Sequence, residues 1–336
     1  MKAGFFQAVK DRVPAKALAA VTLAVADVEK VLQHEVGSDV RSVKGSGEQT
    51  LLGGGKRLRP ALAIIAARAT GGDFDKGAIV HVGAALEMIH MATLIHDDVI
   101  DDAETRRGHA TASAIYGNTA AILSGDVLLA KAMSLLARYS DIHIIEMVSR
   151  AVVEMAEGEV RELEVRGDFE LSEEEHMRVL RMKTAAFIEV CCRAGCRMAG
   201  GTREQEDGLG AYGHHLGMAF QVVDDLLDFR GDHAKTGKPI ATDFREGQAT
   251  LPLIYLLPHL TDEEARFTKS KFGNGVSDEE VAMITKWMAE RGAFDAASDT
   301  AESLIAHASK GLSALPDSDE KRLLETVARF VVEREA

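Results

Sequence analysis

Two short groups of aspartates, far apart in otherwise apolar sequence, share the pattern DDxxD. The first cluster is Asp97, Asp98 and Asp101, followed directly by Asp102, and the second cluster is Asp224, Asp225 and Asp228. Residues at i and i+4 lie on one face of a helix, so the outer aspartates of each cluster form a carboxylate pair that points one way. Each cluster follows a long apolar stretch that predicts a nearby helix C-terminus, where the helix dipole disfavours anions. A cation is therefore expected at each cluster.

Mg2+ is the simplest cation for such clusters, because it keeps several waters and usually binds through one or two carboxylates together with substrate phosphates. The two clusters therefore predict two to three Mg2+ ions that hold a polyphosphate substrate. A solvated acidic helix end is the alternative interpretation of an isolated motif. The duplication of the motif, with apolar flanks in both copies, favours the metal site.

The composition predicts an all-α protein. Of 336 residues, 46% are hydrophobic but only 5% are aromatic, so the core must be largely aliphatic, which suits packed helices better than sheets. The length allows two domains, yet no Pro-, Gly- or Ser-rich linker divides the chain. We therefore expect a single domain from residue 1 to residue 336.

The charge and the cysteines limit the partners and the compartment. A formal net charge of -14 argues against broad binding to nucleic acid or to an anionic membrane, since both require a basic surface. Cys191, Cys192 and Cys196 match neither a zinc site nor a disulfide framework and are interpreted as buried thiols. The chain shows no secretory signal and no run of eighteen apolar residues. We expect a cytoplasmic protein whose contact with a membrane is at most peripheral.

Apolar residues at helical spacing predict where the helices lie. The predicted helices span about 15–32, 58–69, 78–100, 113–138, 142–164, 172–200 and 204–229, and cover most of the chain from 251 onward. Ser172 and Glu175 are spaced as a capping box that opens the helix carrying Lys183 and Thr184. Since each aspartate cluster ends a long helix, the two clusters could face each other across the cavity of a helical bundle.

Basic residues in the sequence could bind the anionic substrate that the aspartate clusters predict. The segment GGGKRLRP puts three glycines before Lys56, Arg57 and Arg59, so backbone amides and cationic side chains meet at a helix start, which favours an anion. The spacing is not that of a Walker loop. A glycine-rich turn with a solvated basic rim is the alternative.

Further donors lie close to each cluster in the sequence. Arg106 and Arg107 follow the first cluster and have planar forks that suit phosphate, although a salt bridge to Asp101 or Asp102 is the alternative. The other candidates are Lys183, Thr184, Gln221, Lys238 and His90. A lone histidine on an apolar helix is otherwise a core residue, so His90 has both interpretations. His96 points to another side of the helix and is given no role.

In order and spacing, five motifs resemble the trans-polyprenyl diphosphate synthases: GGGKRLRP, LIHDDVIDDAETRRG, RMKTAAF, FQVVDDLLDF and KTGKPIATDFREGQATLPL. The resemblance covers roughly residues 50 to 255. It implies the all-helical isoprenoid synthase fold, a bundle around a central cavity, and a homodimer. It also implies a prenyltransferase that joins isopentenyl diphosphate to an allylic diphosphate such as farnesyl diphosphate in successive 1'-4 trans additions.

The resemblance assigns roles to the candidate residues. Asp97, Asp101 and Asp224 would be the principal Mg2+ ligands, assisted by Asp98, Asp225 and Asp228, whereas Asp102 lies outside the motif. Lys56, Arg59, His90 and Arg107 would bind isopentenyl diphosphate. Arg106, Lys183, Thr184, Gln221 and Lys238 would hold the allylic diphosphate, and Lys183 and Lys238 would also help to neutralise the charge on the leaving group. The family often has Lys where this chain has Gln248, which removes one potential cation from that site.

The length of the product is predicted from the residues upstream of the first cluster. Ala92 and Thr93 are small where short-chain members of the family tend to carry an aromatic residue, and one turn further back Met88 and Ile89 could limit the chain. These residues predict a long product of C40 to C50, suited to a quinone side chain. Ala92 as ordinary helix packing is the alternative.

A shorter-chain farnesyl or geranylgeranyl diphosphate synthase is the alternative to a long-chain synthase. Three other functions are less consistent with the motifs. A non-catalytic partner subunit usually loses part of one aspartate cluster, and both clusters are complete here. A terpene cyclase has a different second metal motif, and an HD-type phosphohydrolase built on His96 and Asp97 would need further histidine ligands that are not evident.

Overall fold

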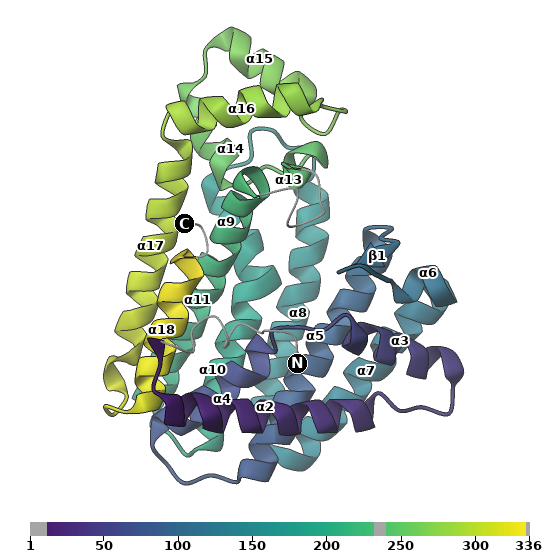
Figure 1. Cartoon of the computed structure of the whole chain (residues 1–336), viewed down its shortest axis with the longest axis vertical. Helices are drawn as coiled ribbons and strands as arrows, with labels where there is room; N and C mark the ends of the chain where they lie inside the picture. The colour runs from purple at the N-terminus through teal and green to yellow at the C-terminus, as the bar shows by residue number, and fades with distance from the viewer. Residues whose placement is uncertain (1–11, 232–239, 334–336) are drawn as a thin grey trace. The chain divides into compact units, whose positions relative to one another are not determined.

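The computed structural model describes residues 12–231 and 240–333. Its helices begin with α2 (Ala15–Glu35), α3 (Arg41–Leu52), α4 (Leu58–Thr70), α5 (Lys76–Ile100), α6 (Ala112–Tyr116), α7 (Asn118–Tyr139) and α8 (Ile142–Val165). They continue with α9 (Glu173–Leu180), α10 (Ala186–Met198), α11 (Arg203–Arg230), α13 (Thr242–Arg245), α14 (Leu251–Leu256), α15 (Asp262–Lys271), α16 (Asp278–Glu290), α17 (Ala293–Gly311) and α18 (Asp319–Glu333). The predicted all-α class is confirmed (Figure 1).

The strands of the described residues form one small hairpin, in which β1 (Thr105–Arg106) pairs antiparallel with β2 (His109–Ala110). Short non-α turns complete the helical segments: a π-helical turn spans Arg181–Ala185, and 3₁₀ turns span Leu257–His259 and Leu312–Ala314.

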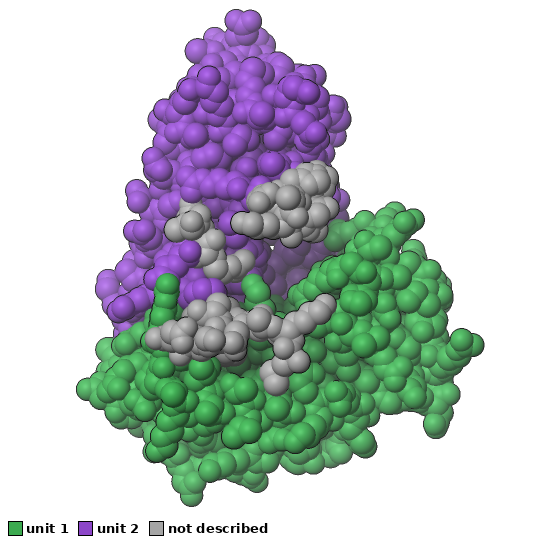
Figure 2. All heavy atoms as spheres, in the orientation of Figure 1, with its two compact units in different colours: residues 1–150, 190–210, 312–326 green, residues 151–189, 211–311, 327–336 purple. Residues whose placement is uncertain are grey.

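The described residues form two compact units (Figure 2). Unit 1 comprises residues 1–150, 190–210 and 312–326, and unit 2 comprises residues 151–189, 211–311 and 327–336. Helices α8, α10, α11 and α18 contribute residues to both units, so the division does not follow a linker. The single domain from 1 to 336 stays a prediction.

Helix α5 is the centre of unit 1. It packs against α7, α4 and α2, and most of its residues are buried, including Leu86, Met88 and Met91. Among the described helices, α5 and α7 are long and apolar enough by length and composition to cross a membrane. A core helix of a soluble protein passes the same test, and 72% of the apolar window of α5 is buried within the chain, against 39% for α7.

Helix α3 was not predicted, because RSVKGSGEQTLL carries two glycines and no clear apolar period. Its glycines permit close packing: a Cβ at Gly45 would lie 2.1 Å from the Tyr116 hydroxyl, and one at Gly47 would lie 2.9 Å from Cβ of Val36. The predicted helix 113–138 is divided into α6 and α7 at Gly117, whose φ of 82° favours glycine.

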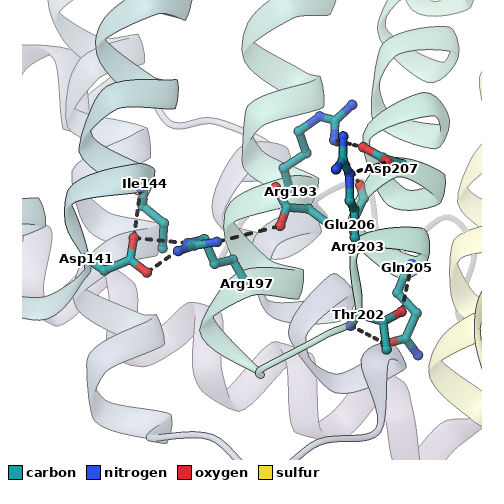
Figure 3. Close-up of polar contacts among 9 residues, drawn as sticks. All are labelled: Asp141, Ile144, Arg193, Arg197, Thr202, Arg203, Gln205, Glu206 and Asp207. Atoms are coloured by element: carbon teal, nitrogen blue, oxygen red, sulfur yellow. Dashed lines mark hydrogen bonds and ion pairs between the residues drawn. The ribbon is translucent and has the colours of Figure 1, made fainter.

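Polar contacts fix the start of α11, the helix that carries the second cluster (Figure 3). The backbone of Thr202 donates to the side chain of Gln205 at 3.0 Å, and the backbone of Gln205 donates to the Thr202 hydroxyl at 3.2 Å, which forms a reciprocal cap. Nearby, Arg197 on α10 donates to Asp141 at 2.8 Å, ahead of α8.

The capping box predicted for α9 is confirmed in one half only. The Ser172 hydroxyl accepts from the backbone of Glu175 at 3.2 Å, but the Glu175 carboxylate accepts from Arg161 at 2.6 Å. Complete boxes open α15 at Thr261 and α16 at Ser277.

A buried ion pair network joins three helices of unit 1. Arg57, directly before α4, donates to Glu29 of α2 at 2.5 Å and to Glu87 of α5 at 3.0 Å. Arg57 has a φ of 47°, a left-handed conformation that few non-glycine residues adopt. The packing of α2, α4 and α5 therefore depends on one arginine of the GGGKRLRP segment.

We expect Arg57→Ala to lower the free energy of unfolding by about 3 kcal/mol, because it leaves the buried Glu87 carboxylate without its partner. Chemical denaturation monitored by circular dichroism measures this loss. Arg150→Ala is the control, since it removes an exposed ion pair to Glu146 and should leave the stability nearly unchanged. Equal losses in the two variants would contradict the structural role of Arg57.

Candidate active site

The first cluster lies at the C-terminal end of α5, as predicted. Asp97 and Asp98 are in the last helical turn, and Asp101 is the C-cap residue. Asp98 is buried and accepts a hydrogen bond from Arg106 of β1 at 2.6 Å. Burial raises the pKa of Asp98, and the contact with Arg106 offsets only part of that effect. Arg106 thus pairs with Asp98, rather than with the neighbouring Asp101 or Asp102.

The hairpin brings Arg107 to the glycine-rich segment. Arg107 and Gly108 form its two-residue turn, and both have positive φ values, 53° and 78°, as a type I′ turn requires. From this turn the Arg107 guanidinium donates to the carbonyl of Gly54. Two of the predicted anion-binding segments, distant in sequence, therefore meet in unit 1.

Four arginines surround His90. Burial, followed by the positive charges of Arg59, Arg107, Arg106 and Arg57, holds the pKa of His90 well below its ordinary value. We call these four residues the arginine cluster. Arg57 forms ion pairs with Glu29 and Glu87. Burial lowers the pKa of Arg59, although nearby negative groups such as Glu87 and Asp97 act to raise it. Lys56 lies in the loop just before α4. This concentration of guanidinium groups suits an anion such as a diphosphate.

The residues predicted to limit product length lie on α5, in the core of unit 1. Met88, Ile89 and Ala92 are each at most 3% exposed. Thr93 is half-buried, and its hydroxyl donates to the carbonyl of His90 at 2.9 Å. Burial is expected both of a tunnel wall and of ordinary helix packing. The gate therefore stays a prediction.

His96 makes a structural contact. Its Nε2 lies 3.1 Å from the carbonyl of Ile122 on α7, and a Cβ at Gly125 would lie 2.3 Å from the same nitrogen. The His96 ring thus packs between α5 and α7 where the two helices come close together.

The second cluster lies in the last two turns of α11, and its aspartates line a cavity of about 460 Å3 within unit 2. We call this the acidic cavity. Its wall also includes Gln221, Gln248, His176, Glu162 and Asp243. Gln221 was predicted, whereas Glu162, His176 and Asp243 were not given roles.

Asp228 binds the backbone at the start of α13. Its carboxylate accepts from the backbone of Thr242 and of Asp243, each at 3.1 Å, and its carbonyl accepts from the backbone of Ala241 at 2.8 Å. Ala241 has a φ of 57° at this turn. Lys238, predicted to bind the allylic diphosphate, lies outside the described residues.

The pKa of Asp243, a residue of the acidic cavity, is shifted upward. Burial, followed by the charges of Asp228, Asp225 and Glu162, raises the pKa of its carboxyl well above the ordinary value. Asp243 stands in the motif KTGKPIATDFREGQATLPL, but a lone aspartate carries no spacing signal that sets it apart. Its proximity to Asp228 is seen only in the structure, where α13 begins beside the end of α11.

Lys183 is held by two glutamates of α8. Its ammonium lies 2.9 Å from Glu159 and 2.5 Å from Glu162. Burial acts to lower the pKa of Lys183, but the Glu162 and Glu159 carboxylates outweigh it and raise the pKa overall. The lysine is therefore a permanent cation beside the acidic cavity.

A π-helical turn presents Lys183 and Thr184, and such turns occur frequently at functional sites. Glycines let the neighbouring helices approach it. A Cβ at Gly158 of α8 would lie 2.7 Å from Cβ of Met182, and one at Gly217 of α11 would lie 2.7 Å from Cα of Ala185.

The donor set of the clusters fits Mg2+, which prefers oxygen ligands. Among the described residues, no group of three or more His, Cys, Asp or Glu side chains is arranged to hold a metal ion without other ligands. Mg2+ usually completes its coordination shell with water and substrate phosphates. A Mg2+ site in this protein therefore does not require three protein side chains around each ion. The first cluster belongs to unit 1 and the second to unit 2, and their predicted face-to-face arrangement stays a prediction.

In metal-free protein, we expect the contribution of Asp243 to the free energy of unfolding to fall as the pH rises above about 4. The folded-state pKa of Asp243 is raised above the ordinary value of 3.8, so folding favours the protonated acid. That advantage is complete at low pH and is lost as the pH rises through the interval between the two pKa values.

Asp243→Asn should flatten this decline, as measured by urea denaturation between pH 4 and about pH 8. Glu302→Gln, which changes an exposed acid of α17, should leave the slope as in the unchanged protein. A slope in Asp243→Asn as steep as in the unchanged protein would show that other groups cause the decline.

Comparison with known proteins supplies the family. The family model described as polyprenyl synthetase matches residues 41–288. Octaprenyl diphosphate synthase of Escherichia coli is 37% identical over 311 residues, which cover 93% of this chain and 96% of that protein.

Solved structures agree with this assignment. A polyprenyl synthase from Caulobacter crescentus, complexed with calcium and isoprenyl diphosphate, has a TM-score of 0.89 and 33% identity, with all of both chains covered. A geranylgeranyl pyrophosphate synthetase from Pyrococcus horikoshii has a TM-score of 0.87 and 30% identity, covering 96% of this chain and 99% of that one. With the clusters and basic residues located above, the chain belongs to the polyprenyl synthetase family and is a trans-prenyltransferase.

Proposed function

We propose that the protein is a Mg2+-dependent synthase that adds isopentenyl diphosphate repeatedly to an allylic diphosphate, farnesyl diphosphate or a similar primer, and makes a C40 to C50 polyprenyl diphosphate for a quinone side chain. The observation that carries the proposal is the pairing of two kinds of site in one chain. The arginine cluster of unit 1 suits a diphosphate, and the acidic cavity of unit 2 suits a metal-bound diphosphate.

The residues divide by chemistry. Arg59, Arg107 and His90 would bind the isopentenyl diphosphate together with Lys56. Lys183, Thr184, Gln221, Arg106 and Lys238 would hold the allylic diphosphate. Asp97, Asp101 and Asp224 would be the principal ligands of two to three Mg2+ ions, with Asp98, Asp225 and Asp228 assisting, and the ions would supply the positive charge that a departing diphosphate requires.

The reaction balances without a further cofactor. The bond between the allylic carbon and the diphosphate oxygen breaks, and the electron pair leaves with the diphosphate. The double bond of isopentenyl diphosphate then forms the new carbon–carbon bond at the allylic carbon. The departing diphosphate would accept the proton that is lost as the trans double bond forms. Fixed cations such as Lys183, which its glutamate partners keep protonated, stabilise the developing anion.

Product length is proposed from α5. Ala92 leaves space one to two turns before the first cluster, and the relative from Escherichia coli is named for an octaprenyl product. The overall fold does not distinguish lengths, because the geranylgeranyl synthetase from Pyrococcus horikoshii has nearly the same TM-score. A shorter-chain synthase is therefore the second candidate, and a non-catalytic partner subunit is a third.

We also propose a homodimer in the cytoplasm, with at most peripheral membrane contact. Support for the dimer comes from apolar side chains near the start of α7: Ile122 is 42% exposed and Leu123 is 56% exposed. A second copy that covers them would remove this apolar surface from water.

The pure protein should convert isopentenyl diphosphate and farnesyl diphosphate, in the presence of Mg2+, into C40 to C50 products that chromatography of the extracted and dephosphorylated material separates by length. Asp224→Asn is the matched control and should lower the rate by a factor of about 100 or more, because it removes a carboxylate that would hold a Mg2+ ion against the leaving group. Products no longer than C20 would support the shorter-chain synthase, absence of elongation the partner subunit, and a cyclic hydrocarbon a cyclase.

Ala92→Tyr should shorten the longest product, because a phenol ring would fill space that the growing chain needs. The same chromatography measures the shift. Ala306→Tyr, at an exposed position of α17, adds an equal ring elsewhere and should leave the product unchanged. If Ala92→Tyr makes the same product as the unchanged protein, Ala92 is an ordinary packing residue.

A further inference from the structure

His176 makes a buried contact with the second cluster. Its Nε2 lies 2.8 Å from Oδ2 of Asp225, and each residue is 6% exposed. His176 is in α9 and Asp225 is in α11, so the contact joins two helices of unit 2 at the wall of the acidic cavity. Nothing in the sequence pattern pairs these residues.

The contact with His176 fixes the orientation of the Asp225 carboxylate, which the spacing of the aspartate motif does not set. Asp224 and Asp228 share a helix face because they are four residues apart, whereas Asp225 is turned by about 100° from Asp224. A carboxylate has two oxygens and a low barrier to reorientation. A donor that binds Oδ2 fixes the carboxylate and leaves Oδ1 for another ligand.

The contact also meets an electrostatic need. Asp225 shares the acidic cavity with Glu162, Asp224, Asp228 and Asp243, and repulsion among them favours rotation or protonation of any member that lacks a fixed partner. Two other members are held from neighbouring segments: Glu162 by Lys183, and Asp228 by the backbone of residues 242 and 243. His176 holds the Asp225 carboxylate in the same way.

We propose that His176 is a positioning residue that orients the Asp225 carboxylate for metal binding in the acidic cavity. The inference rests on the proposed Mg2+-dependent function. Hydrogen-bond partners of metal-ligating carboxylates set the orientation of the ligand, and their removal costs about 10- to 100-fold in metal affinity or activity. His176 would act through the Asp225 carboxylate and not as a metal ligand.

The test measures metal binding apart from product formation. Full-length protein with saturating inorganic diphosphate is titrated with Mg2+, and the rise in melting temperature gives the midpoint, since a ligand that binds only the folded state stabilises it by mass action. His176→Leu should raise the midpoint about 10- to 100-fold. His176→Gln retains an N–H donor at a similar reach and should restore most of the affinity.

Matched variants separate positioning from general damage. His215→Leu replaces a half-buried histidine elsewhere on α11 and should leave the midpoint unchanged. A double variant, His176→Leu with Asp225→Asn, should bind Mg2+ no more weakly than Asp225→Asn alone, because the histidine acts through that carboxylate. In elongation assays, His176→Leu should raise the Mg2+ requirement and leave the KM for isopentenyl diphosphate unchanged.

Several results would overturn the proposal. These are a His176→Leu midpoint equal to that of the unchanged protein, losses that add in the double variant, and the absence of any Mg2+-dependent stabilisation in the unchanged protein. A product of unexpected length leaves the metal titration untouched, so it bears on the proposed function and not on His176.

Discussion

Repulsion between carboxylates in a confined space governs the arrangement of side chains in unit 2. Unit 2 places five acidic side chains around one cavity, and burial makes their mutual repulsion stronger than it would be in water. Burial, followed by the charges of Asp228, Asp225 and Glu162, raises the pKa of Asp243, and burial raises the pKa of Glu162. A bound cation would offset this repulsion. The cavity therefore favours positive charge before any ligand binds.

The elements around the cavity are arranged to keep that charge in place. Two glycines allow α8 and α11 to approach the π-helical turn, which directs Lys183 toward the glutamates of α8. In unit 1 the opposite charge is concentrated: the arginines around His90 favour its neutral form and an anionic ligand. Each unit thus contains residues with strongly shifted pKa values, and such residues cluster at functional sites.

The sequence predicted the long helices well, because α2, α4, α5, α8 and α11 have clear apolar periods and distinct ends. It missed α3, whose glycines are explained by contacts with Tyr116 and Val36 that no local pattern reveals. The aspartate clusters and the basic motifs could be found from spacing alone. The roles of Arg57, Asp243 and His176 could not, because each depends on a partner from another segment, and a single sequence contains no signal for such a pairing.

Helix α5 is one uninterrupted rod of 25 residues that carries both the first cluster and the proposed gate. Because it is rigid and buried on most sides, a change of one side chain along it alters the available space without moving the aspartates at its end. Each helical turn along α5 moves a side chain about 5.4 Å further from the first cluster. If the proposed gate sets product length, single substitutions along α5 would change the product while the aspartates that carry the chemistry stay in place.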